Sequence, residues 1–323
     1  MVNLVYILAA SHSGSTLLAM LLGAHPEVVT AGELAPGNFG DISEYRCSCR
    51  SLFLECPFWR CLASKMKQRG TDFRLTSFGT RFQDVNGSLA RHLLRPLHRG
   101  RALEALRDLG LRMTPSWRRQ YPRLVQNNQA LIEAVSDISG KPIVVDSSKS
   151  AVRLKFLLRI PDLCVKVIRL IRDGRGVSLA YTNQACFADA SDPMLRGGGT
   201  GIVEWQERFS IAEAAYRWKR SNEETERVLA GLDPSQWKEI RYEELCVKTS
   251  ETMNRLFTFL TLDPELARSD FRSHDQHIIG NGMRLDSTSK ISLDERWKHV
   301  LTSSQLRTFE RVAGRVNRAY GYD

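Results

Sequence analysis

The sequence is 323 residues long and has no apolar run of the roughly 18 residues that a membrane-spanning helix needs. Its first apolar stretch, Leu4–Ala10, is short, has no basic segment before it and continues into a glycine-containing loop. These features are not those of a secretory signal peptide, so we expect a cytoplasmic protein without a transmembrane segment. The sequence also has no internal repeats.

Seven cysteines are present, and four of them are grouped as Cys47, Cys49, Cys56 and Cys61. Without a secretory signal, disulfides are not expected. The spacing of the group matches none of the common zinc-finger patterns, and no histidine is close to it in the sequence. We expect reduced thiols packed in a compact loop, and a zinc site is the alternative.

Acidic residues are fewer than basic ones, and the formal net charge is +10. This balance favours an anionic partner, such as a nucleotide, a sulfated or phosphorylated molecule, a nucleic acid or an acidic membrane face. Basic residues gather between Lys65 and Arg123, with leucines among them. Leu103, Leu106 and Leu109 indicate an amphipathic helix there. Aromatic residues are too sparse for a nucleic-acid platform, so no nucleic-acid partner is expected.

Apolar strand-like runs alternate with helical patterns over most of the chain, which predicts an α/β fold with a central parallel sheet between two layers of helices. The predicted strands are Val5–Ala10, Val28–Thr30, Ile143–Val145, Val165–Ile171 and Trp237–Ile240; the predicted helices include Leu124–Ser139, Val152–Leu158, Glu207–Leu229, Met253–Leu260 and Leu306–Tyr320. We expect one domain over residues 1–323, with a helical and basic insertion at about 45–123 and a glycine-rich lid at about 186–203.

The first predicted strand ends in a loop of small residues, Ser11–Thr16, and a helical pattern follows. Such a loop lets an anion approach the backbone N–H groups at the positive end of the helix. The alternative is an ordinary strand-to-helix turn with capping serines. Nucleotide hydrolases carry a lysine directly after the last glycine of this loop, where Ser15 follows Gly14 here, and this difference weakens an ATPase or GTPase interpretation.

Three charged residues are expected at the same edge of the sheet as this loop, because each follows the carboxyl end of a predicted strand. Glu33 follows the second strand, Lys149 the third and Arg172 the fourth. A carboxylate there can act as a general base, and cations there can bind phosphate. Each residue alone is as easily a solvated surface charge, so the prediction depends on their convergence.

Taken together, these segments resemble the sulfotransferases that use 3′-phosphoadenosine 5′-phosphosulfate (PAPS), most closely the bacterial branch and the tyrosylprotein sulfotransferases. The segments that carry the resemblance are Ser11–Leu18, His25-Pro26 with Gly32-Glu33, Val144–Lys149, Ile171–Arg175, Arg241–Leu245, Gly280–Arg284 and Glu55–Trp59. They span nearly the whole chain in the family's order. The resemblance implies a P-loop-like fold and sulfuryl transfer to an acceptor hydroxyl.

The resemblance also implies roles for individual residues. Glu33 is expected to be the general base, with Lys149 and His12 stabilising charge. The donor is expected to contact Ser11, His12, Ser13, Gly14, Ser15, Thr16, Arg172, Ser178, Tyr242, Asn281 and Arg284. Cations of the protein would neutralise the leaving phosphate, so no metal is expected in the reaction.

Two positions depart from the family pattern. His12 stands where the family's loop has an arginine, so charge stabilisation would depend on Lys149 or on a protonated His12. Ala180 stands where a serine is usual at the 3′-phosphate site, and Ser178 lies two residues earlier on another face of the helix.

Two other functions remain as alternatives: a nucleotide-dependent kinase on a similar fold, and a basic protein that binds nucleic acid or other anions. The kinase alternative would use Asp146, at the end of a predicted strand, as a metal ligand. The sequence does not rank a sugar, a lipid, a phenol or a peptide as the acceptor. It also leaves the oligomeric state and peripheral membrane contact open.

Overall fold

The structure is a computed structural model that describes residues 2–37, 39, 41–95, 101–182, 209–273 and 276–323. Its strands are β1 (Val2–Ala9), β2 (Val28–Thr30), β3 (Ile143–Lys149), β4 (Leu163–Ile171) and β5 (Trp237–Arg241). Its α-helices are α1 (Ser15–Gly23), α2 (Pro57–Gln68), α3 (Ser88–Leu93), α4 (Arg101–Met113), α5 (Pro115–Ser139), α6 (Ala151–Leu157), α7 (Gly174–Thr182), α8 (Ile211–Leu229), α9 (Tyr242–Val247), α10 (Thr249–Phe259), α11 (Trp297–Val300), α12 (Ser303–Phe309) and α13 (Arg315–Ala319).

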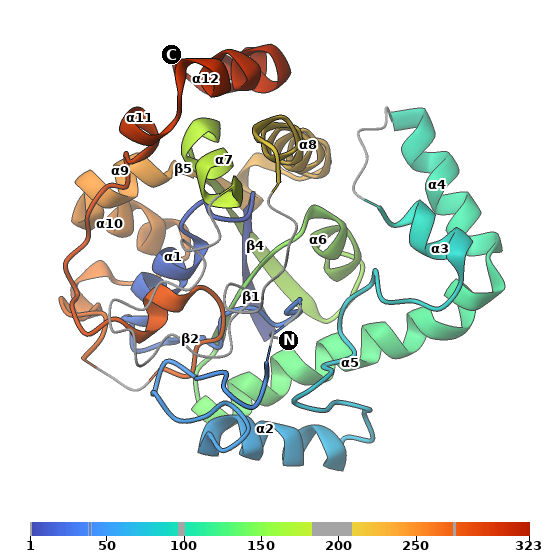
Figure 1. Cartoon of the computed structure of the whole chain (residues 1–323). Coiled ribbons are helices and arrows are strands. Elements are labelled where there is room, and N and C mark those ends of the chain that lie inside the picture. Colours follow the sequence, from blue (N-terminus) through green and yellow to red (C-terminus); the bar gives the residue numbers. More distant parts are fainter. Residues whose placement is uncertain (1, 38, 40, 96–100, 183–208, 274–275) are drawn as a thin grey trace.

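The strands form one five-stranded sheet in the order β2-β3-β1-β4-β5, and every pairing is parallel (Figure 1). The first strand is therefore central, and its carboxyl end lies between those of β3 and β4. This arrangement brings together the edge at which the loop after β1 and the residues after β2, β3 and β4 were expected to meet. The prediction of a central parallel sheet is confirmed.

Alternate side chains of β1 build the cores on the two faces of the sheet. Leu4, Tyr6 and Leu8 lie in one buried cluster with residues of α2, α5 and α6. Val5 and Ile7 lie in a second cluster, with residues of α1 and α10. Because both faces are covered, the strand is apolar from Leu4 to Ala9, and the molecule has the three layers that the sequence predicted.

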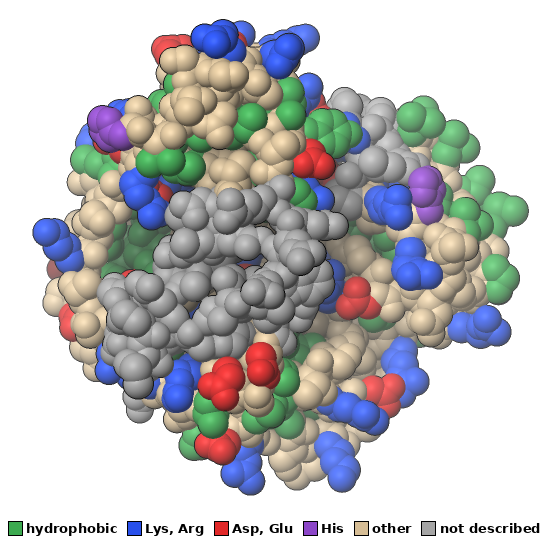
Figure 2. Space-filling model, in the orientation of Figure 1, with side chains coloured by type: hydrophobic (Ala, Val, Ile, Leu, Met, Phe, Trp, Pro, Cys, Tyr) green, Lys and Arg blue, Asp and Glu red, His purple; other side chains and the backbone are tan. Residues whose placement is uncertain are grey.

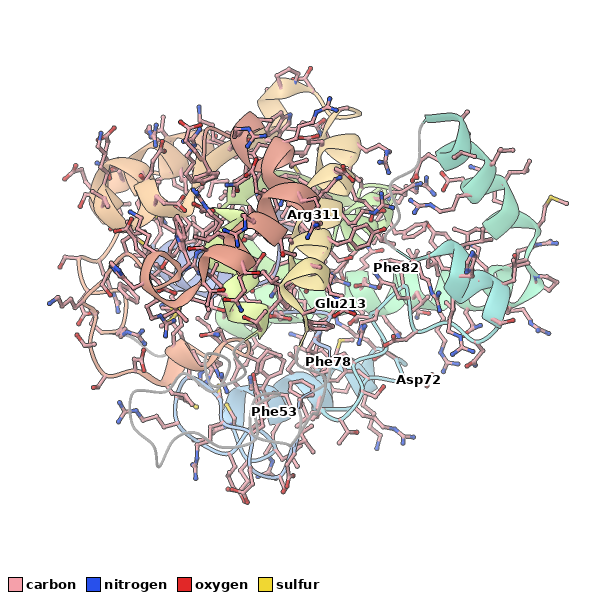
Figure 3. All side chains as sticks on the ribbon, turned by 45° about the horizontal axis from the view of Figure 1, so that its top comes forward. Phe53, Asp72, Phe78, Phe82, Glu213 and Arg311 are labelled. Atoms are coloured by element: carbon pink, nitrogen blue, oxygen red, sulfur yellow. The ribbon has the colours of Figure 1, made fainter. Side chains whose placement is uncertain are left out.

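Helices α2, α3 and α4 lie between β2 and β3 in the sequence, within the predicted insertion. An aromatic cluster fills its first half: Phe53 stacks on Phe78 at a ring distance of 6.4 Å and lies edge-on to Trp59 at 5.1 Å (Figure 3). Phe82 belongs to a separate buried cluster. The division into a domain, an insertion and a lid stays a prediction, and the predicted lid at about 186–203 lies outside the described residues.

Helix α4 turns three of its four leucines outward. Leu103, Leu106 and Leu109 are 53 to 60% exposed, and hydrophobic side chains gather at the margin of the molecule where α3 and α4 lie (Figure 2). Two other side chains of α4 face the protein: Leu111 is buried in an apolar cluster, and buried Arg107 pairs with Glu224 on α8 at 3.4 Å. The apolar period predicted the helix correctly, but that period does not identify the side that faces the protein.

The predicted closing helix is interrupted. Helix α12 continues into a π-helical segment, Glu310–Gly314, before α13. Helix α5 begins at Pro115, nine residues before the predicted start, with a proline in its first turn. In the described part of the chain, no helix combines the length and the apolar character that crossing a bilayer requires.

Candidate active site

The loop between β1 and α1 has the geometry of an anion site. Gly14 has a φ of 89° and forms the N-cap of α1, and no side chain caps this helix end. The N–H groups of the first turn have no partner within the helix, and they lie at the positive end of its dipole. The buried Ser13 hydroxyl also has no hydrogen-bond partner among the described residues. Ser15 and Thr16 are buried in the first turn of α1. These donors suit a phosphate or sulfate group.

Tyr242 and Arg172 lie against this loop. A Cβ atom at Gly14 would lie 2.5 Å from Cδ2 of Tyr242, so only glycine fits beneath the ring. The Arg172 guanidinium carbon is 4.3 Å from the centre of the same ring, and its Nη1 donates to the carbonyl oxygen of His12 at 2.8 Å. The burial of Tyr242 raises the pKa of its hydroxyl above the usual value, so the ring is neutral. A glycine, an aromatic ring and a cation from three distant segments therefore form one surface.

Arg172 has an acidic partner that the sequence analysis did not identify. Its Nη2 donates to the Asp294 carboxylate at 2.9 Å and to the Asp294 carbonyl oxygen at 3.1 Å. Burial alone would raise the pKa of Asp294, but hydrogen bonds from Arg296 and Arg172 hold it well below the usual range. The carboxylate is therefore ionised and offsets the Arg172 charge. No local pattern in the sequence connects these residues, which are 122 positions apart.

Glu33 and Lys149 form an ion pair across the ends of β2 and β3. The Lys149 ammonium donates to Glu33 Oε1 and, at 3.3 Å, to the carbonyl oxygen of Ser147. Both side chains are partly buried, at 23 and 14% exposure. Lys149 has a φ of 66°, a conformation that is uncommon for residues other than glycine. The acid and one of the two cations predicted for this edge of the sheet thus lie in direct contact.

Asp146 holds the backbone on both sides of this ion pair. Its fully buried carboxylate accepts from the N–H of Leu34 at 3.2 Å and from that of Ser148 at 2.9 Å. Its second oxygen accepts from Arg153 Nε at 2.9 Å. Both oxygens are occupied and shielded from solvent, so Asp146 is not placed to bind a magnesium ion. This position weakens the kinase alternative.

His12 lies between the two cations of the site. Burial, followed by the charges of Lys149 and Arg172, lowers the pKa of His12 to about 3. The imidazole is therefore neutral at physiological pH in the structure. Its ring packs edge-on against Tyr181 at 4.8 Å, and Tyr181 also forms a hydrogen bond with the Ser11 side chain. The sequence left charge stabilisation to Lys149 or to a protonated His12. Because His12 is neutral, Lys149 is the better candidate of the two.

Three predicted donor contacts remain: Asn281, Ser178 and Arg284. The backbone N–H of Asn281 donates to the Thr16 hydroxyl at 3.3 Å, so the Gly280–Asn281 segment borders the loop. Ser178 is fully buried on α7, and its hydroxyl has no partner in the described part of the chain. Arg284 is also buried, but its guanidinium donates to the carbonyl oxygens of Gly280 and Arg46 at 2.6 to 3.1 Å.

Arg284 therefore joins two backbone segments, and the predicted contact between Arg284 and the donor is not supported by its position. A contact with an aromatic ring also ties Arg284 to the protein, since its guanidinium carbon lies 4.4 Å from the Tyr45 ring centre. The sequence motif located this residue near the site but did not show that its donors are used within the protein. An arginine that binds several carbonyl oxygens stabilises a fold.

No protein-family model and no curated protein matches this sequence. The structure is similar to the sulfotransferase domain from the curacin biosynthetic pathway, at 18% identity over 100% of this chain and 99% of that one, with a TM-score of 0.47. It is also similar to the sulfotransferase domain of the Synechococcus olefin synthase, at 16% identity over 99 and 95% of the chains and a TM-score of 0.46. A Mycobacterium avium sulfotransferase is similar at 13% identity over 99 and 77%, with a TM-score of 0.49.

Proposed function

We propose that this protein transfers a sulfuryl group from PAPS to a hydroxyl group of an acceptor. The observation that carries the proposal is the contact between the Glu33 carboxylate and the Lys149 ammonium, beside an uncapped helix N-terminus. A base, a cation and an anion cradle at one sheet edge are the groups that in-line transfer of a charged group requires. The resemblance of the sequence motifs to PAPS-dependent sulfotransferases supports the same donor.

The donor would occupy the surface formed by the loop and the residues around it. The N–H groups of Ser13–Thr16 and the Ser13 hydroxyl suit the 5′-phosphosulfate. Arg172, with Tyr242 beside it and the Ser178 hydroxyl on the following helix, suits the 3′-phosphate that distinguishes PAPS from ATP. Two buried serine hydroxyls without described partners fit this assignment, because buried polar groups are usually hydrogen-bonded.

In the reaction, the acceptor oxygen attacks the sulfur atom, and the bond between sulfur and the bridging phosphate oxygen breaks. Glu33 takes the proton of the acceptor hydroxyl. The negative charge that develops on the departing phosphate is stabilised by Lys149 and by the loop N–H groups. His12 contributes a neutral hydrogen-bonding group. Side chains of the protein supply all of this charge, and the proposal requires no metal for the transfer.

The chemical class of the acceptor follows only as far as a hydroxyl group, on a sugar, a lipid, a phenol or a peptide. The kinase alternative requires a metal-binding carboxylate and a loop lysine. Asp146 is already saturated by Leu34, Ser148 and Arg153, and the residue after Gly14 is a serine. Both observations weigh against a kinase, so the transfer of a sulfuryl group is the function that the site supports best.

Thermal unfolding in metal-free buffer tests the donor directly. Adenosine 3′,5′-bisphosphate at about one hundred times its Kd is expected to raise the Tm by roughly 4 °C, whereas AMP and ADP at the same concentration raise it less. ATP is compared with and without magnesium. A larger shift with magnesium and ATP than with the bisphosphate would favour a kinase and would contradict this proposal.

A further inference from the structure

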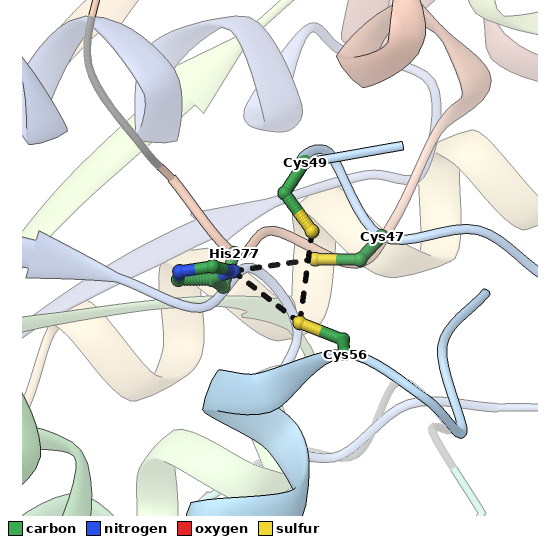
Figure 4. A group of neighbouring side chains, drawn as sticks. All are labelled: Cys47, Cys49, Cys56 and His277. Atoms are coloured by element: carbon green, nitrogen blue, oxygen red, sulfur yellow. Dashed lines mark hydrogen bonds between the residues drawn. The ribbon is translucent and has the colours of Figure 1, made fainter. Parts of the chain in front are cut away.

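Three cysteines and one histidine that are far apart in the sequence lie together in the structure. The ligand atoms of Cys47, Cys49, Cys56 and His277 all lie within 4.8 Å of one another, and the side chains point toward a common centre (Figure 4). The histidine lies more than 200 positions after the cysteines, so the sequence spacing did not reveal it. Cys61, the fourth cysteine of the sequence group, is exposed and lies outside this cluster.

The distances fit a tetrahedral metal site. Zinc bonds of about 2.3 Å to sulfur and about 2.0 Å to nitrogen place two sulfurs roughly 3.8 Å apart and a sulfur and a nitrogen roughly 3.5 Å apart. The Sγ atoms of Cys49 and Cys56 are 3.6 Å apart. His277 Nδ1 is 3.3 Å from Cys56 Sγ and 3.9 Å from Cys47 Sγ. A disulfide would require about 2.05 Å between sulfurs, so these cysteines are not bonded to one another.

The cysteines are held by the local backbone. Cys47 opens a tight turn in which its N–H donates to the Ser51 carbonyl at 3.0 Å and its carbonyl accepts from Arg50 at 2.8 Å. Arg50 has a φ of 68°, which turns the chain back so that Cys49 can face the centre. Cys56 is the N-cap of α2, and it faces the same centre from the other side.

His277 is oriented by its neighbours. Its ring stacks on Phe58 at 4.8 Å with an angle of 3° between the planes, which directs Nδ1 toward the sulfurs. The segment that carries it is tied to the cysteine turn through Ser48, whose hydroxyl accepts from the Ile278 N–H at 2.7 Å and donates to the carbonyl of Gln276. Cys47 and Cys56 also belong to a buried apolar cluster, but the sulfurs of all three cysteines converge on one another and on an imidazole nitrogen, which packing alone does not require.

We propose that Cys47, Cys49, Cys56 and His277 bind one zinc ion. A set of three thiolates and one imidazole suits zinc, and four protein ligands leave no open coordination position. The site is therefore structural and takes no part in group transfer. The proposal does not depend on the proposed function, because it concerns residues outside the anion loop and its cations.

The site would fasten the insertion to the segment that borders the active site. Two residues after His277, the N–H of Ile279 donates to the Ala31 carbonyl at 3.1 Å, just before Gly32 and Glu33. A Cβ atom at Gly32 would lie 1.9 Å from the Ile279 carbonyl oxygen, so the two segments are in close contact. A zinc ion at one end of this contact would limit the movement of the Glu33 backbone.

Metal analysis of the untagged full-length protein tests the proposal. We expect about one zinc ion per chain in the wild type and in the Cys61→Ser variant, which is the matched control because Cys61 is exposed and outside the cluster. Cys56→Ser and His277→Ala are expected to lose most of the zinc and to unfold at a lower temperature. The assignment is wrong if the wild type, refolded in the presence of zinc, holds no metal, or if both variants retain it.

A second measurement covers the case in which these variants do not fold. Wild-type protein is stripped with a chelator and reloaded with cobalt(II), and its absorption spectrum is recorded. Thiolate ligands in a tetrahedral site give intense visible bands and a sulfur-to-metal charge-transfer band. Cobalt that gives neither band, with all cysteines still reactive toward a thiol reagent, would contradict the site. Because neither measurement uses turnover or a nucleotide, failure here would leave the proposed function unaffected.

Discussion

Replacing Glu33 with glutamine separates the base from the binding surface. The substituted amide would keep the shape of the side chain and an oxygen that can accept from Lys149, while it loses the negative charge and the ability to take a proton. The ion pair is partly exposed, at 23 and 14% for the two side chains, so its loss is expected to lower the free energy of unfolding by only about 1 kcal/mol. Glu33→Gln protein is therefore expected to fold.

The expected effect on catalysis is much larger. A positioned general base contributes about 10² to 10⁴ in rate, equivalent to roughly 3 to 5 kcal/mol of the barrier. The affinity for adenosine 3′,5′-bisphosphate is expected to stay the same or to rise, because a neutral amide competes less than a carboxylate for the Lys149 ammonium. This combination, a loss of turnover with unchanged or tighter nucleotide binding, is not expected from a merely structural glutamate.

Two assays measure the two effects. Release of adenosine 3′,5′-bisphosphate from PAPS is followed with a panel of acceptors that includes a phenol, a sugar and a tyrosine peptide, and calorimetry gives the bisphosphate Kd. Glu27→Gln is the matched control, since Glu27 is exposed and lies just before the same strand. Turnover that survives in Glu33→Gln refutes the assignment of the base. Turnover and bisphosphate affinity that fall together would indicate a structural role.

Two further changes test the anion loop. Gly14→Ala places a methyl group against Tyr242 at a φ of 89°, so it is expected to cost roughly 1 to 3 kcal/mol of stability and to weaken bisphosphate binding. Gly70→Ala is the control, because Gly70 also has a positive φ, 70°, but no atom lies within 4 Å of the added methyl group. This control should show the loss of stability from backbone strain without the loss of bisphosphate binding. His12, with its pKa of about 3, is expected to remain neutral in an NMR titration from pH 8 to about pH 5. In the unfolded chain His12 gains a proton near pH 6.5, so the free energy of unfolding should fall below that pH by up to about 1.4 kcal/mol per pH unit. A His12 that titrates near pH 6.5 in the folded protein would contradict its burial.

The strands and the loop could be predicted because their signals are local. The start of β3, Ile143–Val145, is a continuous apolar run typical of a buried parallel strand and was predicted, although the strand itself continues through the polar residues 146–149. The rule that parallel strands deliver their carboxyl ends to one edge then placed Glu33, Lys149 and Arg172 near Gly14 without any knowledge of the contacts. The location of the site at the carboxyl ends of the strands was therefore predictable from the order of strands and helices in the sequence.

The partners of these residues could not be predicted, because each comes from a loop with no periodic signal. Asp294 reaches Arg172 from a segment without helix or strand, and His277 reaches the cysteines in the same way. For Arg284, a sequence motif predicted a position near the site, but nothing in the sequence indicated that its guanidinium binds backbone carbonyl oxygens. Side-chain pairing depends on tertiary packing, which a single sequence does not encode in its local pattern.

The contacts at the site also suggest why its acid and cations are paired as they are. Lys149 is held by Glu33 and Arg172 by Asp294, so each cation that would meet the donor already contacts a carboxylate. A donor with a phosphosulfate and a 3′-phosphate must compete with both acids, and its binding free energy is therefore a difference between two sets of charged contacts. Where the donor takes Lys149, the Glu33 carboxylate loses this partner and becomes available to the acceptor hydroxyl. In the proposed reaction, occupation of the anion loop would thus prepare the base for the acceptor.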